Sequence, residues 1–124
     1  MFCAVSLDDY EVAKKITIET GHEYNDTNTM HLVFILEDNV SGIASARYNG
    51  GAIRIDYVGL VESARGKGFG DFLTRSIINK VMDLVEVVEV NSTSDYFLKF
   101  GFKRVGDIMV AKSRDIVFPS ICKH

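Results

Sequence analysis

The spacing of apolar and polar residues changes along the chain, and each change predicts a new element. Runs of β-prone residues predict strands at 2–6, 31–36, 40–48, 52–61, 85–90, 102–105 and 107–111. Apolar residues at helical spacing predict helices from Ser6 to about Gly21, from Phe69 to about Leu84 and from Thr93 to Phe100. The expected order of elements is therefore β, α, β-β-β, α, β, α, β.

The connections between these elements add information about topology. Asn49-Gly50-Gly51 predicts a tight hairpin turn, because Asn and Gly tolerate positive φ angles. A strand, a helix and a second strand follow one another between residues 52 and 90, which predicts a parallel pair joined by a crossover helix. The polar stretch 22–29 is a loop with two interpretations, a carrier of binding residues or a solvated connector.

Composition narrows the class of protein. The chain has 124 residues, of which 47% are hydrophobic and 25% charged, and this suits one globular domain over residues 1–124 with an unassigned tail at 113–124. The net charge of −3 excludes a broad electrostatic footprint for nucleic acid. No apolar run approaches the ~18 residues that a membrane span needs, so no membrane partner is expected.

Cysteine usage and the N-terminus indicate the compartment. Cys3 and Cys122 lie near opposite ends of the chain and have no metal-ligand spacing, so no metal is expected. The N-terminus has no basic segment followed by an apolar region and a cleavage site. A cytoplasmic location is the expectation that follows.

The stretch from Arg65 to Gly70 carries the clearest chemical signal. Three glycines alternate with Lys67 and Phe69 between a predicted strand and a predicted helix. The free amides at a helix N-terminus carry the positive end of the helix dipole, and glycines let the backbone approach a ligand closely. Together with the two basic side chains, this pattern predicts a phosphate or pyrophosphate site.

The glycine spacing excludes two common phosphate motifs. A Walker loop needs Ser or Thr after the Lys, whereas Gly68 follows Lys67, and the dinucleotide fingerprint needs G-x-G-x-x-G. The pattern R-x-x-G-x-G, carried by Arg65, Gly68 and Gly70, resembles the acyl-CoA signature of the GCN5-related N-acetyltransferases, the GNAT family. The alternative is a glycine-rich turn without a ligand.

A second stretch supports the resemblance. Residues 96–102 are similar to the late helix of that family, which ends in a Gly-Phe pair after an aromatic residue and a Lys. The two motifs lie within Ile53 to Val105, and the order of elements matches over nearly the whole chain. The resemblance implies an α/β (α+β) acyl-CoA N-acyltransferase fold, with a mixed central sheet of about six to seven strands and three to four flanking helices.

The resemblance also implies a donor, an acceptor and a mechanism. Acetyl-CoA would be the cosubstrate, and a small-molecule or peptide primary amine would attack its thioester directly in a ternary complex. The backbone near Leu60 and Val61 would hold the pantetheine arm as an added strand. The pyrophosphate would lie on the loop amides of Arg65, Gly66, Lys67, Gly68, Phe69 and Gly70.

The chain departs from the family pattern at three places. Glu62 stands near the position where members often have a proline. The tyrosine that protonates the leaving thiolate in many members falls at Phe97, and Tyr96 is its neighbour. The segment before His31, where members usually build part of the acceptor site, is short, so the site is open or is completed by a second subunit in a homodimer.

Four groups of residues are candidates for proton transfer. Asp56 is the first candidate base, because burial raises the pKa of a carboxylate in an apolar strand; its alternative is an ion pair with Arg54 or Arg47. Glu62 is the second, with a solvated loop acid as its alternative. Glu23 and His22 are the third, and Tyr96 is the candidate acid, with ring packing as its alternative.

Three hypotheses of function follow from the sequence. The first is an N-acetyltransferase that uses acetyl-CoA, with an open acceptor class. The second is a non-catalytic module that binds or senses acyl-CoA, which the displaced tyrosine and the short acceptor region favour. The third is a plain nucleotide or phosphate binder that uses only the glycine loop.

Overall fold

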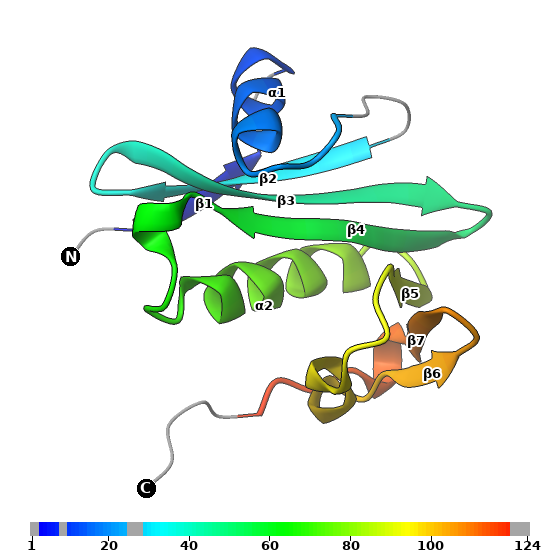
Figure 1. Cartoon of the computed structure of the whole chain (residues 1–124). Coiled ribbons are helices and arrows are strands. Elements are labelled where there is room, and N and C mark those ends of the chain that lie inside the picture. The colour runs from blue at the N-terminus through cyan, green and yellow to red at the C-terminus, as the bar shows by residue number, and fades with distance from the viewer. Residues whose placement is uncertain (1–2, 8–9, 25–28, 120–124) are drawn as a thin grey trace, which may run out of the picture.

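All seven strands join one sheet in the computed structural model, which describes residues 3–7, 10–24 and 29–119 (Figure 1). The strands are β1 (Cys3–Leu7), β2 (Thr29–Leu36), β3 (Asn39–Asn49), β4 (Ala52–Leu60), β5 (Val87–Val90), β6 (Lys103–Val105) and β7 (Ile108–Lys112). The helices are α1 (Tyr10–Glu19) and α2 (Phe69–Met82), with 3₁₀ helices η1 (Glu62–Ala64), η2 (Asp95–Phe100) and η3 (Ser113–Asp115). The spatial order is β1-β2-β3-β4-β5-β7-β6.

The sheet is mixed, as expected. Strands β1 to β4 are antiparallel neighbours, β4 and β5 are parallel, and β5, β7 and β6 are again antiparallel. Helix α2 is the crossover between β4 and β5, and α1 and α2 lie on opposite faces of the sheet (Figure 1). The predicted mixed sheet of six to seven strands is confirmed, whereas the expected late helix is the short 3₁₀ helix η2.

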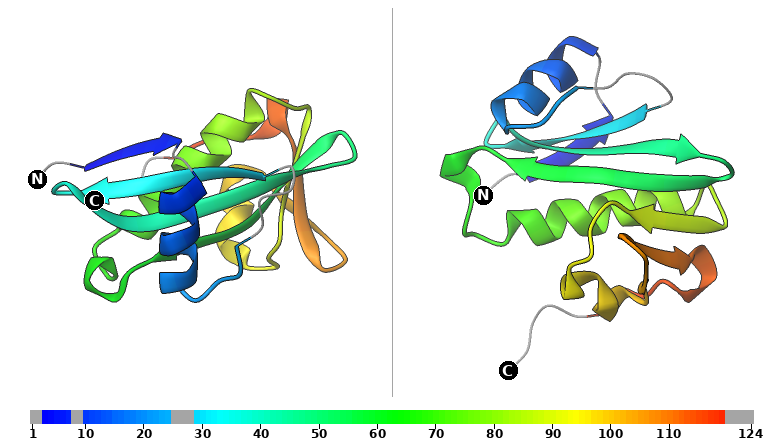
Figure 2. Two further views of the ribbon diagram at one scale, coloured as in Figure 1. Left: turned by 90° about the horizontal axis from the view of Figure 1, so that it is seen from above. Right: turned by 45° about the vertical axis from the view of Figure 1, so that its right-hand side comes forward.

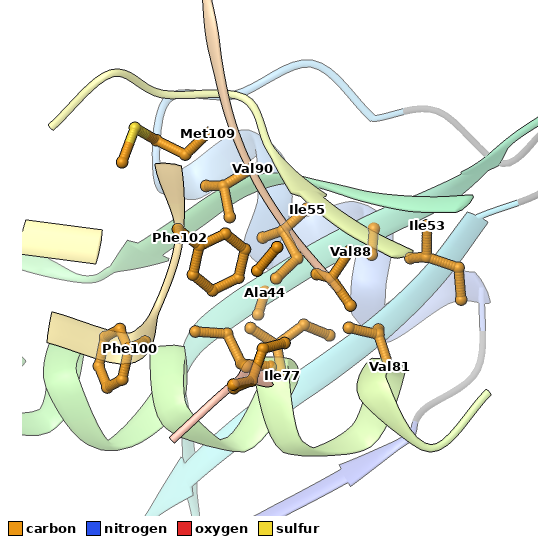
Figure 3. Close-up of a cluster of buried hydrophobic side chains, with 14 of the residues drawn as sticks. Ala44, Ile53, Ile55, Ile77, Val81, Val88, Val90, Phe100, Phe102 and Met109 are labelled. Atoms are coloured by element: carbon orange, nitrogen blue, oxygen red, sulfur yellow. The ribbon is translucent and has the colours of Figure 1, made fainter. Parts of the chain in front are cut away.

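Two apolar clusters hold the helices to the sheet. The larger one lies between the sheet and α2 and includes Ile77 and Val81 of α2 together with Phe100 and Phe102 (Figure 3). The smaller one joins α1 to the other face of the sheet and contains Ala13, Ile16, Val33 and Ile43. These helical residues recur every three or four positions, so each helix presents a single apolar stripe to the sheet.

The predicted start of the first helix at Ser6 was wrong. Ser6 belongs to β1 and pairs with Val33 of β2, because the apolar run before it continues as a sheet strand. The helix begins at Tyr10, and residues 8–9 between the strand and the helix lie outside the described residues. The predicted stop is confirmed: Gly21 takes φ 90° one residue past Thr20, a conformation that suits glycine.

The tail that the sequence left unassigned packs against the domain as far as residue 119. Ile116 is buried in the larger cluster, and the backbone amide of Val117 donates to the carbonyl of Phe100 at 3.0 Å. Arg75 of α2 donates from Nη1 to the carbonyl of Pro119 at 2.6 Å. Residues 120–124, including Cys122, lie outside the described part of the chain.

The lengths of the helices also bear on a membrane location. Among the described residues, neither α1 nor α2 combines the length and the hydropathy that crossing a bilayer requires.

Candidate functional site

A β-bulge places Asp56 at the centre of the candidate site. Ser45 of β3 pairs with Tyr57 of β4, and the next residue, Ala46, pairs with Ile55, so Asp56 is the extra residue of the bulged strand. A bulge bends a strand and changes the direction of its side chains. This explains how a carboxylate can stand in the middle of a largely apolar strand without entering the core.

Beyond the bulge, β4 has no neighbouring strand on the β5 side. The parallel ladder joins residues 53–55 of β4 to residues 88–90 of β5 and ends where the amide of Asn91 donates to the carbonyl of Ile55 at 2.8 Å. Strand β4 continues to Leu60, and β5 lies beside only its first part (Figure 2). The second half of β4 therefore has one open edge.

The hydrogen bonds to β3 show which backbone groups face that open edge. The amide of Val61 donates to the carbonyl of Ser41 at 2.9 Å, and its carbonyl accepts from the amide of Ala64. Backbone groups of an antiparallel strand point alternately to its two sides. Val58 and Leu60 therefore face the open edge, whereas Val61, which the sequence proposed for the pantetheine arm, is already paired.

The glycine loop after β4 adopts the backbone that its sequence requires. Gly66 has φ 77° and Gly68 has φ 85°, and a side chain rarely takes either conformation. Gly68 is the N-cap of α2 and provides no side-chain cap, so the amides of Phe69, Gly70 and Asp71 have no partner within the helix. These amides and the helix dipole form a positive, accessible helix N-terminus.

Of the two basic side chains in the loop, only that of Arg65 bonds to the backbone of the described residues. Lys67 is exposed, whereas Arg65 bends back so that its Nε donates to the carbonyl of Leu60 at 3.1 Å. The ring of Phe69 packs on Phe34 with 5.1 Å between centroids, so only its backbone faces the loop surface. Gly70 has no positive φ, and an added Cβ would lie 3.8 Å from a methyl of Leu60.

A cavity of about 560 Å³ opens beside the bulge. Its lining includes His22, Glu23 and Tyr24 from the segment after α1, Asp56 and Tyr57 from β4, and Asn91 from the end of β5. The structure thus brings the first and third base candidates, Asp56 with Glu23 and His22, to one site.

Asp56 combines burial with an ion pair. Its side chain is 17% exposed, and one carboxylate oxygen lies 3.3 Å from Nε of Arg47. Burial raises the pKa of Asp56 above its ordinary value, and the positive charges of Arg47, Arg54 and His31 oppose that rise. The ion pair that the sequence offered as an alternative is therefore present together with the raised pKa that a base requires.

Aromatic stacking fixes the wall of the cavity. The rings of His22 and Tyr57 stack with 4.2 Å between centroids, and the Tyr57 hydroxyl donates to Oγ1 of Thr17 in α1 at 3.2 Å. The end of α1 comes so close to β4 that a Cβ on Gly59 would lie 2.9 Å from Cβ of Thr20. Glycine at position 59 is what lets α1 and the following segment reach the open edge.

The remaining two candidates lie outside this cavity lining. The hydroxyl of Tyr96 donates to Asp71 in the first turn of α2, and Arg75 donates to the other oxygen of that carboxylate at 2.7 Å. Burial and the bond to Asp71 raise the pKa of Tyr96. Glu62 is exposed in η1, about 20 Å along the chain direction from Asp56 at the rise of an extended strand.

The carboxylate of Asp71 stays ionised in this arrangement. Burial acts to raise the pKa of Asp71, but the hydrogen bonds from Tyr96 and Arg75 outweigh it and the net shift is downward. Lys99 of η2 adds a further positive charge at 3.7 Å from the same carboxylate. Asp71 therefore joins the first turn of α2 to η2.

Metal ligands do not gather in the described part of the chain. No group of three His, Cys, Asp or Glu side chains there is arranged to hold a metal ion.

Comparisons with known proteins place this geometry in context. No family model matches the sequence, and no curated protein matches it. Many solved structures do match. The ribosomal-protein-S18-alanine N-acetyltransferase from Escherichia coli is similar with a TM-score of 0.72 and 9% identity, over 99% of each chain. A GNAT family acetyltransferase from Brucella melitensis in complex with acetyl-CoA has a TM-score of 0.71 and 15% identity, over 90% of this chain and 88% of that one.

A third structure agrees with these two. A GNAT family N-acetyltransferase from Escherichia coli in complex with CoA has a TM-score of 0.70 and 12% identity, over 90% of this chain and 81% of that one. The chain has the GNAT acetyltransferase fold. The fold that the two sequence motifs implied is thereby confirmed.

Within this GNAT fold, the sequence did not indicate five residues of the cavity lining: Gly21, Tyr24, Ser45, Tyr57 and Asn91. Tyr57 appeared to be an ordinary strand residue, and only the bulge before it turns the strand there. Asn91 had one usable signal, since it is the first polar residue after the β5 run. Tyr24 lies in the polar loop whose binding role was left open.

Proposed function

We propose that this protein is an N-acetyltransferase that moves an acetyl group from acetyl-CoA to a primary amine. One observation carries the proposal: the open edge of β4 runs from the glycine loop at one end to the Asp56 cavity at the other. A donor with a phosphate end and a reactive end suits that arrangement. The similar structures with bound acetyl-CoA or CoA support the same interpretation.

The donor end depends on backbone groups. The amides of Phe69, Gly70 and Asp71 are suited to bind the pyrophosphate because they have no partner within the helix and lie at its N-terminus, and the loop around Gly66 and Gly68 adds neighbouring amides. Lys67 adds a positive charge at the loop surface. Val58 and Leu60 offer backbone groups with which the pantetheine amides can pair like an added strand.

The carbonyl of Leu60 can pair with the pantetheine arm only if Arg65 releases it. In this structure it accepts from Arg65, so pairing at that oxygen requires the guanidinium to turn away. Arg65 would then point toward the loop surface, where its charge favours the pyrophosphate. Arg65 thus has one position that braces the loop and another that binds the donor.

The acceptor end depends on Asp56. An amine must lose a proton before it attacks, and the raised pKa of Asp56 brings this carboxylate closer to a base that works near neutral pH. Asp56 takes the proton from the ammonium, the amine nitrogen bonds to the thioester carbon, and the carbon–sulfur bond breaks. The nitrogen then gives its second proton to water, and the thiolate leaves and takes up one proton. The net reaction releases one proton and forms no covalent enzyme intermediate.

Tyr96 is the proposed source of that proton. Its hydroxyl donates to Asp71 in this structure, so it must turn from Asp71 toward the thiolate. Glu62 stays a second candidate base that would act only through water, because it is exposed in η1 and outside the cavity lining. Of the proposed groups, Asp56 alone lies in the cavity with a raised pKa.

A non-catalytic module that binds acyl-CoA is the second candidate function. The observation that favours it is the position of Tyr96, which the Asp71 carboxylate holds outside the cavity lining. A turnover assay separates the two functions: free CoA is measured in the presence of a panel of primary amines. Release of CoA that depends on an amine supports the enzyme. Binding of acetyl-CoA with no such release on the whole panel refutes it and supports the module.

A further inference from the structure

We infer that the acceptor is a cationic amine that carries a second positive charge and no carboxylate, a diamine rather than an amino acid. This inference rests on the proposed function, since it concerns the acceptor end of the same site. It follows from the charges in and around the Asp56 cavity.

The first step concerns the charges of the lining itself. Among the described residues that line the cavity, Glu23 and Asp56 are carboxylates and none is Lys or Arg. Sites that bind a substrate carboxylate tend to present Arg, whose guanidinium matches it with two parallel hydrogen bonds. The described lining offers no such group, and it offers two negative charges instead.

The second step concerns the nearest positive charges. Arg47 pairs with Asp56 at 3.3 Å, and Arg54 pairs with Glu89 of β5 at 2.9 Å. Neither arginine lines the cavity. A carboxylate on the acceptor would therefore meet the charge of Glu23 and that of Asp56, which Arg47 already offsets in part, with no Lys or Arg in the described lining to pair with it. Like charges repel, so such an acceptor is disfavoured.

The third step assigns the two carboxylates to two positive charges. Asp56 serves the reacting ammonium in the proposed mechanism. Glu23 is exposed at the cavity and makes no hydrogen bond or ion pair with a residue that the structure describes, so its charge is available to the acceptor. The rings of Tyr24 and Tyr57 contribute apolar surface that suits an aliphatic stem between two charged ends.

The test compares three acceptors that differ by one group at a time. They are 1,5-diaminopentane, lysine, which adds a carboxylate, and 1-aminopentane, which lacks the second amine. We expect kcat/KM to be highest for the diamine and about tenfold lower for lysine, because of repulsion by two carboxylates in a partly screened site. The monoamine should fall about threefold below the diamine, the usual effect of one exposed ion pair.

A matched pair of variants assigns the effect to Glu23. Glu23→Gln should lower kcat/KM for the diamine about threefold more than it lowers kcat/KM for the monoamine, so that the ratio of the two falls to about one. Glu19→Gln removes the same charge from an exposed position in α1 outside the cavity lining, and it should change neither acceptor. Equal losses in the two variants would mean that overall charge, and not Glu23, selects the acceptor.

The outcomes separate this inference from the proposed function. If lysine is acetylated at least as well as the diamine, the inference is overturned while the acetyltransferase proposal stands. If diamine and monoamine react equally, the second charge plays no role and the inference is overturned as well. If acetyl-CoA binds but none of the three amines releases CoA, both the inference and its basis fail.

Discussion

Replacing Gly68 by alanine tests the donor site most directly. The substitution adds a single Cβ at the N-cap of α2, where φ is 85° and no heavy atom lies within 4 Å of the position. The added methyl therefore meets no protein atom, and the fold should persist. It would instead stand beside the amides that we propose for the pyrophosphate.

The substitution should change two quantities separately, the melting temperature and the Kd for acetyl-CoA. A left-handed conformation costs a residue with a Cβ about 1–2 kcal/mol of stability. For a chain of 124 residues this lowers Tm by about 4–8 °C. The loss of one hydrogen bond to a charged phosphate oxygen costs about 1.5–3 kcal/mol of binding free energy, so Kd for acetyl-CoA should rise about 10- to 150-fold.

Gly106 supplies the matched control. It lies between β6 and β7 at the far edge of the sheet, with φ 62° and no heavy atom within 4 Å of its Cβ position. Gly106→Ala should therefore lower Tm by a similar amount and leave Kd unchanged. Titration calorimetry with acetyl-CoA and thermal melting measure the two quantities. An unchanged Kd for Gly68→Ala, or an equal rise for Gly106→Ala, would refute the assignment of the loop.

Three further predictions concern catalysis and stability. Asp56→Asn should lower kcat/KM about 100-fold at pH 7. The loss of kcat/KM in this variant should become smaller as the pH rises to 9.5, because more of the amine is then neutral in solution. A loss that does not vary with pH would show that Asp56 is not the base. In the unmutated enzyme, the acidic limb of the pH–rate profile should report a pKa above the ordinary value for Asp, because burial raises the pKa of Asp56. Tyr96→Phe should lower kcat about tenfold with little change in KM for acetyl-CoA, and steady-state kinetics that show an unaltered kcat would leave Tyr96 as a link to Asp71 only. Ile77→Ala removes a fully buried side chain between α2 and the sheet and should cost about 2–5 kcal/mol in chemical denaturation; a cost below about 1 kcal/mol would contradict the packing.

Most of the fold could be predicted from local patterns. Helix α2 begins at Phe69 as expected, because Gly66 and Gly68 lie between the strand and the apolar stripe that follows. The hairpin at Gly50 and Gly51 has the expected positive φ angles. The errors lie where tertiary pairing competes with local signals: Ser6 resembles a helix cap but pairs in β1, and the tail is held by contacts with Phe100 and Arg75 that have no local pattern.

The candidate site could be predicted only at its donor end. The glycine loop is continuous in sequence, so its spacing alone indicates a phosphate site. The cavity joins segments near residues 23, 56 and 91, and its existence depends on a bulge and on the divergence of two strands. The sequence indicated Arg54 or Arg47 as a partner of Asp56, but only the structure shows that Arg47 of β3 forms the ion pair and that His31 of β2 adds to the charge around it. The bond between Tyr96 and Asp71 is likewise a contact across 25 positions of the chain.

The short ladder between β4 and β5 joins the two strands along only part of their length. Three residue pairs connect them, and beyond these pairs Asp56 and Asn91 line the same cavity from its two sides. A donor that pairs with the open edge of β4, as proposed above, would lie between these two sides and form part of the wall that the acceptor meets. We therefore expect acceptor affinity to depend on donor occupancy, with ordered addition and the donor first as its kinetic form.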